Sequence, residues 1–235
     1  MGCQFTAADS SWARYDGSPA SVDFADAQDG FFGCWFKILS DPAGTQYLVN
    51  RRDSGNVSAW NLSVAAGPLG AAWIMPASGA GSENVATAIG AWRCLIANVT
   101  AGNLVVTVDG VASAADAVGS GPLAHSVDMR FGADDSGTTN HLDGMVAEMV
   151  KRDGAASASE VAMFMAGIRP DVIWPNLDIY IPFDQRNRFA SVVGPAWEAN
   201  STTPPVIVID HPAGIGTGRH GLRLDHGIGR PMPMR

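Results

Sequence analysis

Apolar and polar residues alternate over short stretches of this chain, and turns rich in Gly, Ser, Asp and Pro separate these stretches. The alternation predicts strands, because successive side chains of a strand point to opposite faces of a sheet. The aromatic segment 31–39 shows it most clearly. Its alternate residues form two faces, one with Phe32, Cys34, Phe36 and Ile38 and the other with Phe31, Trp35 and Leu39.

Further segments with this pattern predict an all-β domain. The expected strands are 31–39, 46–51, 57–64, 70–75, 92–99, 104–108, 111–115, 127–132, 145–150 and 177–183, with a short β-branched run at 206–209. Asp109 and Gly110 predict a tight hairpin turn. We expect loops over 76–90 and 133–141, where Gly, Ser, Asp and Thr are frequent.

One short helix is predicted after these strands. Ser157 and Glu160 form the S-x-x-E pattern of a capping box, and Gly167 stands where a left-handed residue ends a helix. The apolar stripe between them consists of Val161, Phe164 and Met165.

The composition agrees with an all-β chain. The 235 residues include 27 Gly but only four Glu and two Lys, which are strong helix formers. Charged residues make up 16% of the chain, against about 25% in average proteins, and the hydrophobic fraction of 46% excludes global disorder. The length fits one β-sandwich domain, since such domains run to roughly 200–250 residues.

The charge and the absence of targeting patterns exclude several partners. The formal net charge of −8 disfavours a nucleic-acid partner, which requires a basic patch. No apolar run approaches the ~20 residues that span a bilayer, so we expect no membrane partner. The first 25 residues lack the basic and apolar regions of a secretory signal.

The cysteines predict an intracellular folding environment. Cys3, Cys34 and Cys94 form no CxxC pair and no zinc-type cluster, so we expect reduced thiols. The start of the chain fits an acylation pattern that could modify Gly2 or Cys3. We favour the alternative, in which Cys3 and Phe5 point inward from a first strand.

The C-terminal segment differs in charge from the rest of the chain. Residues 1–203 carry 11 basic and 21 acidic residues, a net charge of −10, whereas residues 204–235 carry four Arg and two Asp, a net charge of +2. We therefore predict a folded domain over 1–203 and an extended tail over 204–235 that anchors the protein to a neighbour. The alternative is that the tail wraps its own domain. An anionic socket on a partner would suit its guanidinium groups. The candidate anchoring residues are His211, Arg219, His220, Arg223, His226, Arg230 and Arg235.

Several segments, taken in order from residue 31 to residue 167, resemble the laminin-G-like or concanavalin A-like jelly-roll family. They are the strand FFGCWFKIL at 31–39, the Gly-x-Trp strand entry at 90–92, the hairpin strand at 103–110, the DG-x-apolar-x-Glu strand at 143–148 and the capped helix at 157–167. The resemblance implies a two-sheet antiparallel jelly-roll sandwich with one short helix and an extended C-terminal tail. This fold serves lectins, hydrolases, adhesion modules and virion proteins.

The end of the chain is similar to small laminin-G-like proteins of tailed phages. The similar segments are Tyr180-Ile181-Pro182-Phe183-Asp184, 193–196 and Asp210-His211-Pro212. This similarity implies a non-enzymatic structural component at the surface of a virion, made in the host cytoplasm. Its expected partners are other virion proteins and further copies of itself in a particle lattice. A carbohydrate-binding host-attachment module is the alternative.

Hydrolysis of glycans is the less favoured alternative. A glycosidase needs two carboxylates beside the scissile bond, and the hydrolases that the chain resembles carry E-x-D-x-x-E or a near variant on one strand. The chain has no such run, and Glu148 stands alone in its predicted strand. We therefore expect no enzymatic activity.

Two kinds of ligand remain as expectations. A surface glycan would need an exposed aromatic platform, for which Trp60, Trp73 and Trp92 are the candidates, although alternation places one or two of them in the core. A calcium ion, which takes six to eight oxygen ligands, could bind Asp134, Asp135 and Asn140. The alternative is that these last three residues only form turns.

Overall fold

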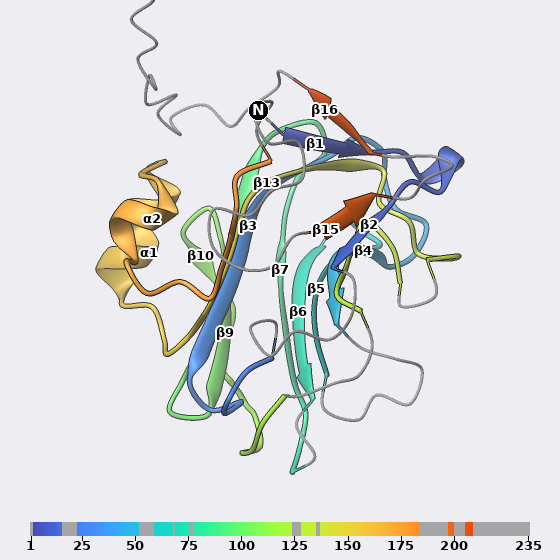
Figure 1. Ribbon diagram of the computed structural model, residues 1–235. Helices are drawn as coiled ribbons and strands as arrows, with labels where there is room; N and C mark the ends of the chain where they lie inside the picture. The colour runs from blue at the N-terminus through green and yellow to red at the C-terminus, as the bar shows by residue number, and fades with distance from the viewer. Residues whose placement is uncertain are drawn as a thin grey trace, which may run out of the picture.

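Two antiparallel β-sheets face each other in this protein, and two short helices lie outside one of them (Figure 1). The arrangement comes from a computed structural model. It describes residues 2–15, 23–51, 59–67, 69–75, 78–123, 128–134, 137–183, 197–199 and 205–208.

The sheet next to the helices, which we call the first sheet, has nine strands in the described residues. In spatial order they are β10 (Val111–Ala112), β9 (Asn103–Val108), β8 (Arg93–Thr100), β3 (Gly30–Ile38), β13 (Gly144–Asp153), β1 (Gly2–Phe5) and β16 (Val206–Val208), with β11 (Asp116–Ala117) on β9 and β14 (Ile179–Ile181) on β13.

The second sheet has seven described strands. Their order is β15 (Trp197–Ala199), β2 (Ala13–Tyr15), β12 (Arg130–Phe131), β4 (Gln46–Arg51), β5 (Ala59–Ala65), β6 (Leu69–Met75) and β7 (Gly81–Ala86). In both sheets several neighbours, such as β8 and β3 or β12 and β4, are distant in sequence, as in a jelly-roll sandwich. The predicted fold class is therefore confirmed.

The core fills the space between the sheets, and the alternation in β3 shows how the sequence divides its side chains. The predicted inner face, Phe32, Cys34, Phe36 and Ile38, lies in this core. Phe31 and Trp35 lie on the other face, in a second apolar cluster beneath the helices. Because both faces of β3 are covered, almost the whole strand is buried.

The predicted hairpin and helix are both present. Asp109 and Gly110 have positive φ values of 49° and 85° and join β9 to β10, with Val108 opposite Val111. Helix α1 (Ala158–Met165) begins at the predicted Ser157 capping box, and α2 (Pro170–Ile173) follows it. Neither helix, within the described part of the chain, is long and apolar enough to cross a membrane.

Two expectations about chain organisation need correction. The stretch 76–90 was expected to be a loop, yet it contains β7, in which Gly81 and Val85 are buried while Ser82 and Asn84 are exposed. Its polar residues face solvent, so hydrophobicity alone does not reveal the strand. In addition, β16 pairs with β1, so the folded domain continues beyond residue 203 at least to Val208.

The first strand buries its apolar residues as expected. Cys3 and Phe5 are both fully buried in β1, where a lipid could not be attached to the thiol without unfolding the strand. Burial raises the pKa of Cys3, Cys34 and Cys94 well above the ordinary thiol value, and all three are free thiols.

A buried cation joins the segment before β3 to the first sheet. Lys151 of β13 is 1% exposed, and its ammonium group donates to Asp153 at 2.9 Å and to Asp178 at 3.1 Å. It also donates to the backbone carbonyl of Asp23. The Asp23 carboxylate in turn accepts from Arg51 of β4 at 2.8 Å, so the network reaches the second sheet.

Candidate functional site

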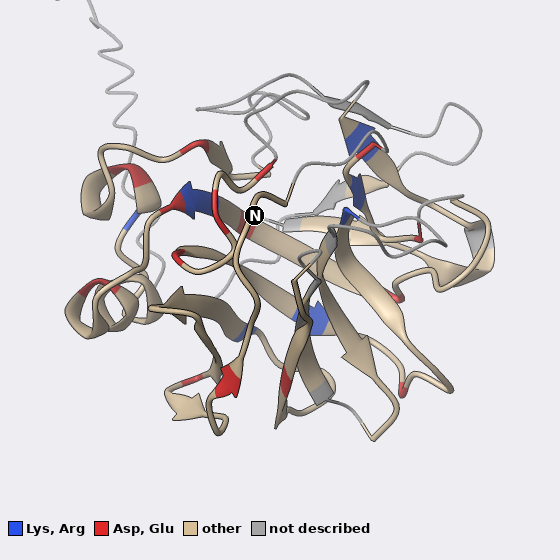
Figure 2. Ribbon diagram, turned by 90° about the horizontal axis from the view of Figure 1, so that it is seen from below, with Lys and Arg blue, Asp and Glu red and all other residues tan. Residues whose placement is uncertain are grey.

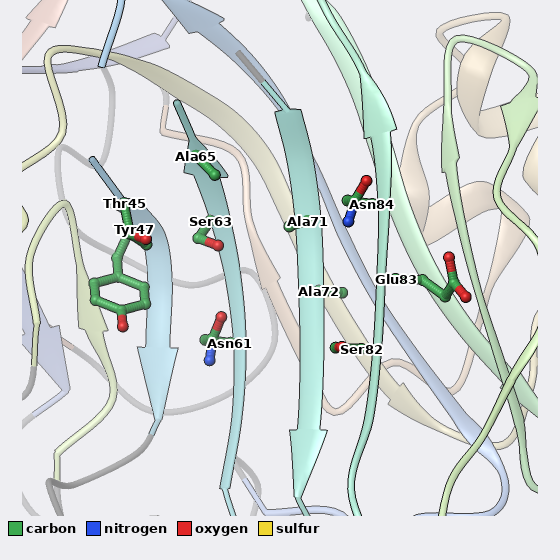
Figure 3. Close-up of a pocket in the computed structure, with 10 residues that line it drawn as sticks. All are labelled: Thr45, Tyr47, Asn61, Ser63, Ala65, Ala71, Ala72, Ser82, Glu83 and Asn84. Carbon is green, nitrogen blue, oxygen red and sulfur yellow. The ribbon is translucent and has the colours of Figure 1, made fainter. Parts of the chain in front are cut away.

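A groove crosses the outer face of the second sheet over strands β4 to β7 (Figure 3). Its volume is about 270 Å³. The described residues that line it are Thr45, Tyr47, Asn61, Ser63, Ala65, Ala71, Ala72, Ser82, Glu83 and Asn84.

The alternation of β5 explains why polar groups reach this groove. Trp60, Leu62 and Val64 are fully buried in the core between the sheets. The residues between them therefore face outward. Figure 3 shows Asn61 and Ser63 on the groove side of β5.

Strand register assembles the floor and walls. Ser63 lies opposite Tyr47 of β4 on one side and opposite Ala71 of β6 on the other, and Ala71 lies opposite Asn84 of β7. These four positions form one row across the sheet. The methyl group of Ala71 leaves space between the larger side chains of Tyr47 and Asn84, and this space is the groove.

The side-chain amide of Asn61 is an unpaired donor in the wall of the groove. Only 3% of Asn61 is exposed, and its Nδ2 atom has no hydrogen-bond partner in the described part of the chain. A buried donor without a partner costs about 1–3 kcal/mol. Such groups call for an explanation. The described part of this chain has several others, among them the indole N–H of Trp35, so it is the position of Asn61 in the groove wall that links its amide to a ligand. The Nδ2 atom itself is enclosed, so an oxygen atom of a ligand in the groove would accept from it only once the Asn61 side chain turns toward the groove.

The groove is polar but almost uncharged. Its described lining contains no Lys, Arg or His, and Glu83 is its one carboxylate. Glu83 projects from β7 to the side away from β6 (Figure 3). In the described part of the chain the charged residues lie largely near strand ends and in helices and loops, and most of the sheet ribbon is uncharged (Figure 2).

The predicted tryptophan platform is not assembled as expected. Trp60 is fully buried in the core, in contact range of Phe24 and Phe32, so its assignment as a surface platform was wrong. Trp92 is half-buried and packs against the cluster beneath the helices, on the other side of the sandwich. The backbone of Trp73 lies opposite Asn61, but its side chain is outside the described part of the structure. Trp73 therefore stays a prediction.

The loop expected to bind calcium uses its described residues to close a turn. The Asp134 carboxylate accepts hydrogen bonds from the backbone N–H groups of Thr138 at 3.1 Å and Thr139 at 3.3 Å, and from the Thr139 hydroxyl. Asn140 has a positive φ of 55° and donates to Thr139 at 3.3 Å. Asp135 lies outside the described residues. No group of three or more acidic, His or Cys side chains suited to a metal occurs among those described.

The predicted anchoring residues of the tail also lie outside the described part of the chain. They are His211, Arg219, His220, Arg223, His226, Arg230 and Arg235. Their role stays a prediction.

A second polar cluster, which sequence reasoning missed, lies under the helices. Glu148 is 6% exposed, has a positive φ of 52° and lies where the pairing of β13 with β3 shifts register. The Tyr180 hydroxyl of β14 donates to its carboxylate at 2.5 Å. Burial raises the pKa of Glu148 to about 7, although the bond from Tyr180 and the charge of Arg169 act in the opposite direction.

The groove lies on a sandwich that a known family shares. The model of the concanavalin A-like lectin/glucanases superfamily matches residues 16–162. The chain belongs to this superfamily. No curated protein matches its sequence.

Solved structures of this superfamily's fold resemble the chain at low identity. Domains LG4-5 of the mouse laminin alpha1 chain share 16% identity at a TM-score of 0.50, over 64% of this chain and 40% of the laminin chain. A Bacteroides ovatus protein, named for a proposed role in carbohydrate binding, shares 13% at a TM-score of 0.61, over 89% of this chain and 61% of its own. Tailspike protein 2 of Escherichia coli O157:H7 bacteriophage CAB120 shares 11% at 0.53, over 77% and 26%.

These three relatives are longer than the region they share with the chain, which spans less than half of the laminin chain and about a quarter of the tailspike. At such identities the likeness shows the fold alone. The superfamily and the groove are therefore the two firm starting points for function.

Proposed function

We propose that the protein is a non-catalytic carbohydrate-binding module that holds a saccharide in the groove across β4–β7. The observation that carries this proposal is the buried, unpaired amide of Asn61 in the groove wall. Saccharides are dense in hydroxyl groups, which accept and donate hydrogen bonds and so complement amides and hydroxyls. The lining offers such groups from Asn61, Ser63 and Asn84.

The absence of catalysis is part of the proposal. Hydrolysis of a glycosidic bond normally requires an acid and a second carboxylate placed on either side of it. Glu83 is the one carboxylate in the described lining of the groove. Binding therefore needs no more than this lining provides, whereas hydrolysis would need a second acidic group.

The direct test compares binding and stability of Asn61→Ala. We expect affinity for a glycan identified on a glycan array to fall at least about tenfold, as the loss of a hydrogen bond to a buried group predicts. The free energy of unfolding should fall by no more than about 1 kcal/mol, because the removed donor had no partner. Asn103→Ala, on β9 of the other sheet, is the matched control and should keep full affinity. Unchanged affinity in Asn61→Ala would refute the site.

A second candidate function, compatible with the first, is a surface component of a virion held by the C-terminal tail. The charge contrast favours it, since the tail carries +2 next to a domain that carries −10. In this proposal other virion proteins bind the tail and neighbouring copies contact each other in the particle. The saccharide groove would then serve host attachment.

Deletion of residues 211–235 tests this second function. The truncated protein keeps all described strands, including β16, so we expect it to fold with an unchanged circular-dichroism spectrum. Incorporation into particles during assembly in a host should be lost. Normal incorporation of the truncated protein would contradict a role for the tail.

A further inference from the structure

We infer that the ligand of the groove is a neutral saccharide, bound by direct hydrogen bonds without a bridging metal ion. This inference rests on the proposed carbohydrate-binding function and narrows its ligand. It depends on two features of the lining, namely its charge and the small number of carboxylates that it could offer to a metal ion.

The charge of the described lining disfavours acidic sugars. A sugar carboxylate or sulfate is normally bound by Arg or Lys through charge-assisted hydrogen bonds. The described lining contains neither residue, and its one charged side chain, Glu83, is acidic. An acidic sugar would lose its hydration in the groove and gain no cation in return, which is unfavourable. A neutral sugar has no such penalty.

The side chains of the lining do not suit a calcium ion that would bridge the sugar to the protein. Calcium takes six to eight oxygen ligands, with carboxylates prominent among them. The groove offers one carboxylate, and Figure 3 shows it at the β7 margin, directed away from β6. Amide nitrogen and hydroxyl groups, such as those of Asn61 and Ser63, instead bind sugar hydroxyls directly.

Asn61 and Ser63 set the position of the ligand within the groove. Both are buried although they face outward, with 3% and 6% exposure. Tyr47, at 8% exposure, stands beside Ser63 as one wall. Once the Asn61 amide turns toward the groove, a sugar hydroxyl that accepts from Nδ2 lies against the strands and between these walls.

The experiment measures the full-length protein on a glycan array that pairs neutral hexose oligosaccharides with counterparts bearing uronic acid or sulfate groups. Each array is run in calcium and in EDTA. We expect signal on neutral members alone, and the same signal in both buffers. Calorimetry of the strongest neutral oligosaccharide should show an affinity that changes less than about twofold between low and high salt, because screening acts on charge pairs.

The outcomes separate the inference from the function on which it rests. Binding that prefers an acidic counterpart, or that EDTA abolishes, would overturn the inference and leave carbohydrate binding intact, provided Asn61→Ala still weakens it. Binding to no glycan in either buffer would overturn both.

Discussion

Glu148 is the residue whose surroundings differ most from what its strand would lead one to expect. Val146 and Met149 of β13 face the main core, while Ala147 and Val150 face the cluster under the helices. The odd spacing from 146 to 149 requires one extra residue, and Glu148 occupies this position with a φ of 52°. Bulges of this kind redirect a side chain. Here the bulge buries a carboxyl group against Tyr180.

This burial makes stability depend on pH. The pKa of Glu148 is raised from 4.5 to about 7, so the folded state binds this proton more tightly than the unfolded state. The stabilising contribution is complete below the unfolded pKa and is lost as the pH rises through about 7. We expect the free energy of unfolding to fall by about 2 kcal/mol between about pH 5 and about pH 8 from this group.

Urea denaturation over this pH range checks the prediction in the wild type and in Glu148→Gln. The neutral amide keeps a similar shape, so the variant should lose most of the pH dependence. Glu83→Gln, on the second sheet, serves as the matched control and should retain the wild-type slope. Equal slopes in wild type and Glu148→Gln would show that another group is responsible.

At the scale of the element, alternation predicted the strands that bury apolar residues. The two faces of 31–38 were assigned correctly because aromatic side chains mark both of them, whereas Leu39 lies beyond β3 and is exposed. Strand β7 was missed because Ser82 and Asn84 face solvent and its inner positions include Gly81. The groove was missed for a related reason. Asn61 and Ser63 become a site only through register with β4 and β6, which a single sequence does not specify.

The tryptophans show the same limit. Trp60 and Asn61 are neighbours in β5, and the sequence indicates that one faces inward and the other outward. Trp60 was predicted as a sugar platform because it is aromatic, but it is fully buried in the core. The polar neighbour, with its unpaired amide, is the better candidate.

The shape of the groove leads to a prediction about β6. Ala71→Leu should fill part of the space between Tyr47 and Asn84 and reduce saccharide affinity at least about tenfold, because the larger side chain occupies volume that the saccharide would take. The position is partly exposed, so the free energy of unfolding should change by no more than about 0.5 kcal/mol.

Calorimetric titration and thermal unfolding of Ala71→Leu measure the two effects. Thr107→Leu, a partly exposed position in β9 of the other sheet, controls for an added apolar side chain. Full affinity in Ala71→Leu would mean that the ligand does not lie over β6.

At the scale of the whole molecule, the two outer faces of the sandwich are unequal. Helices α1 and α2 cover part of the first sheet through Phe164 and Trp174, which pack on Phe31 and Trp35 (Figure 1). The capping box and the apolar stripe predicted α1 from the sequence. On the second sheet the face over β4–β7 carries the groove. Because the helices pack on the first sheet, the groove lies on the outer face of the second sheet.

The charge contrast within the chain belongs to the same scale. The sequence alone separates an acidic domain from a basic tail. The structure extends the folded domain at least to β16, whose three residues pair with β1 at the edge of the first sheet. The described part of the domain therefore ends at this edge of the first sheet, whereas the groove lies on the second sheet.

The central claim is that a saccharide binds in the groove through Asn61, and NMR mapping of the binding site tests it most directly. A neutral oligosaccharide selected on the array is titrated into isotope-labelled full-length protein. We predict that the side-chain amide of Asn61 shifts most, together with the backbone amides of Ser63, Ala71 and Asn84. Shifts confined to the 134–140 loop or to the helices, with Asn61 unchanged, would contradict the account.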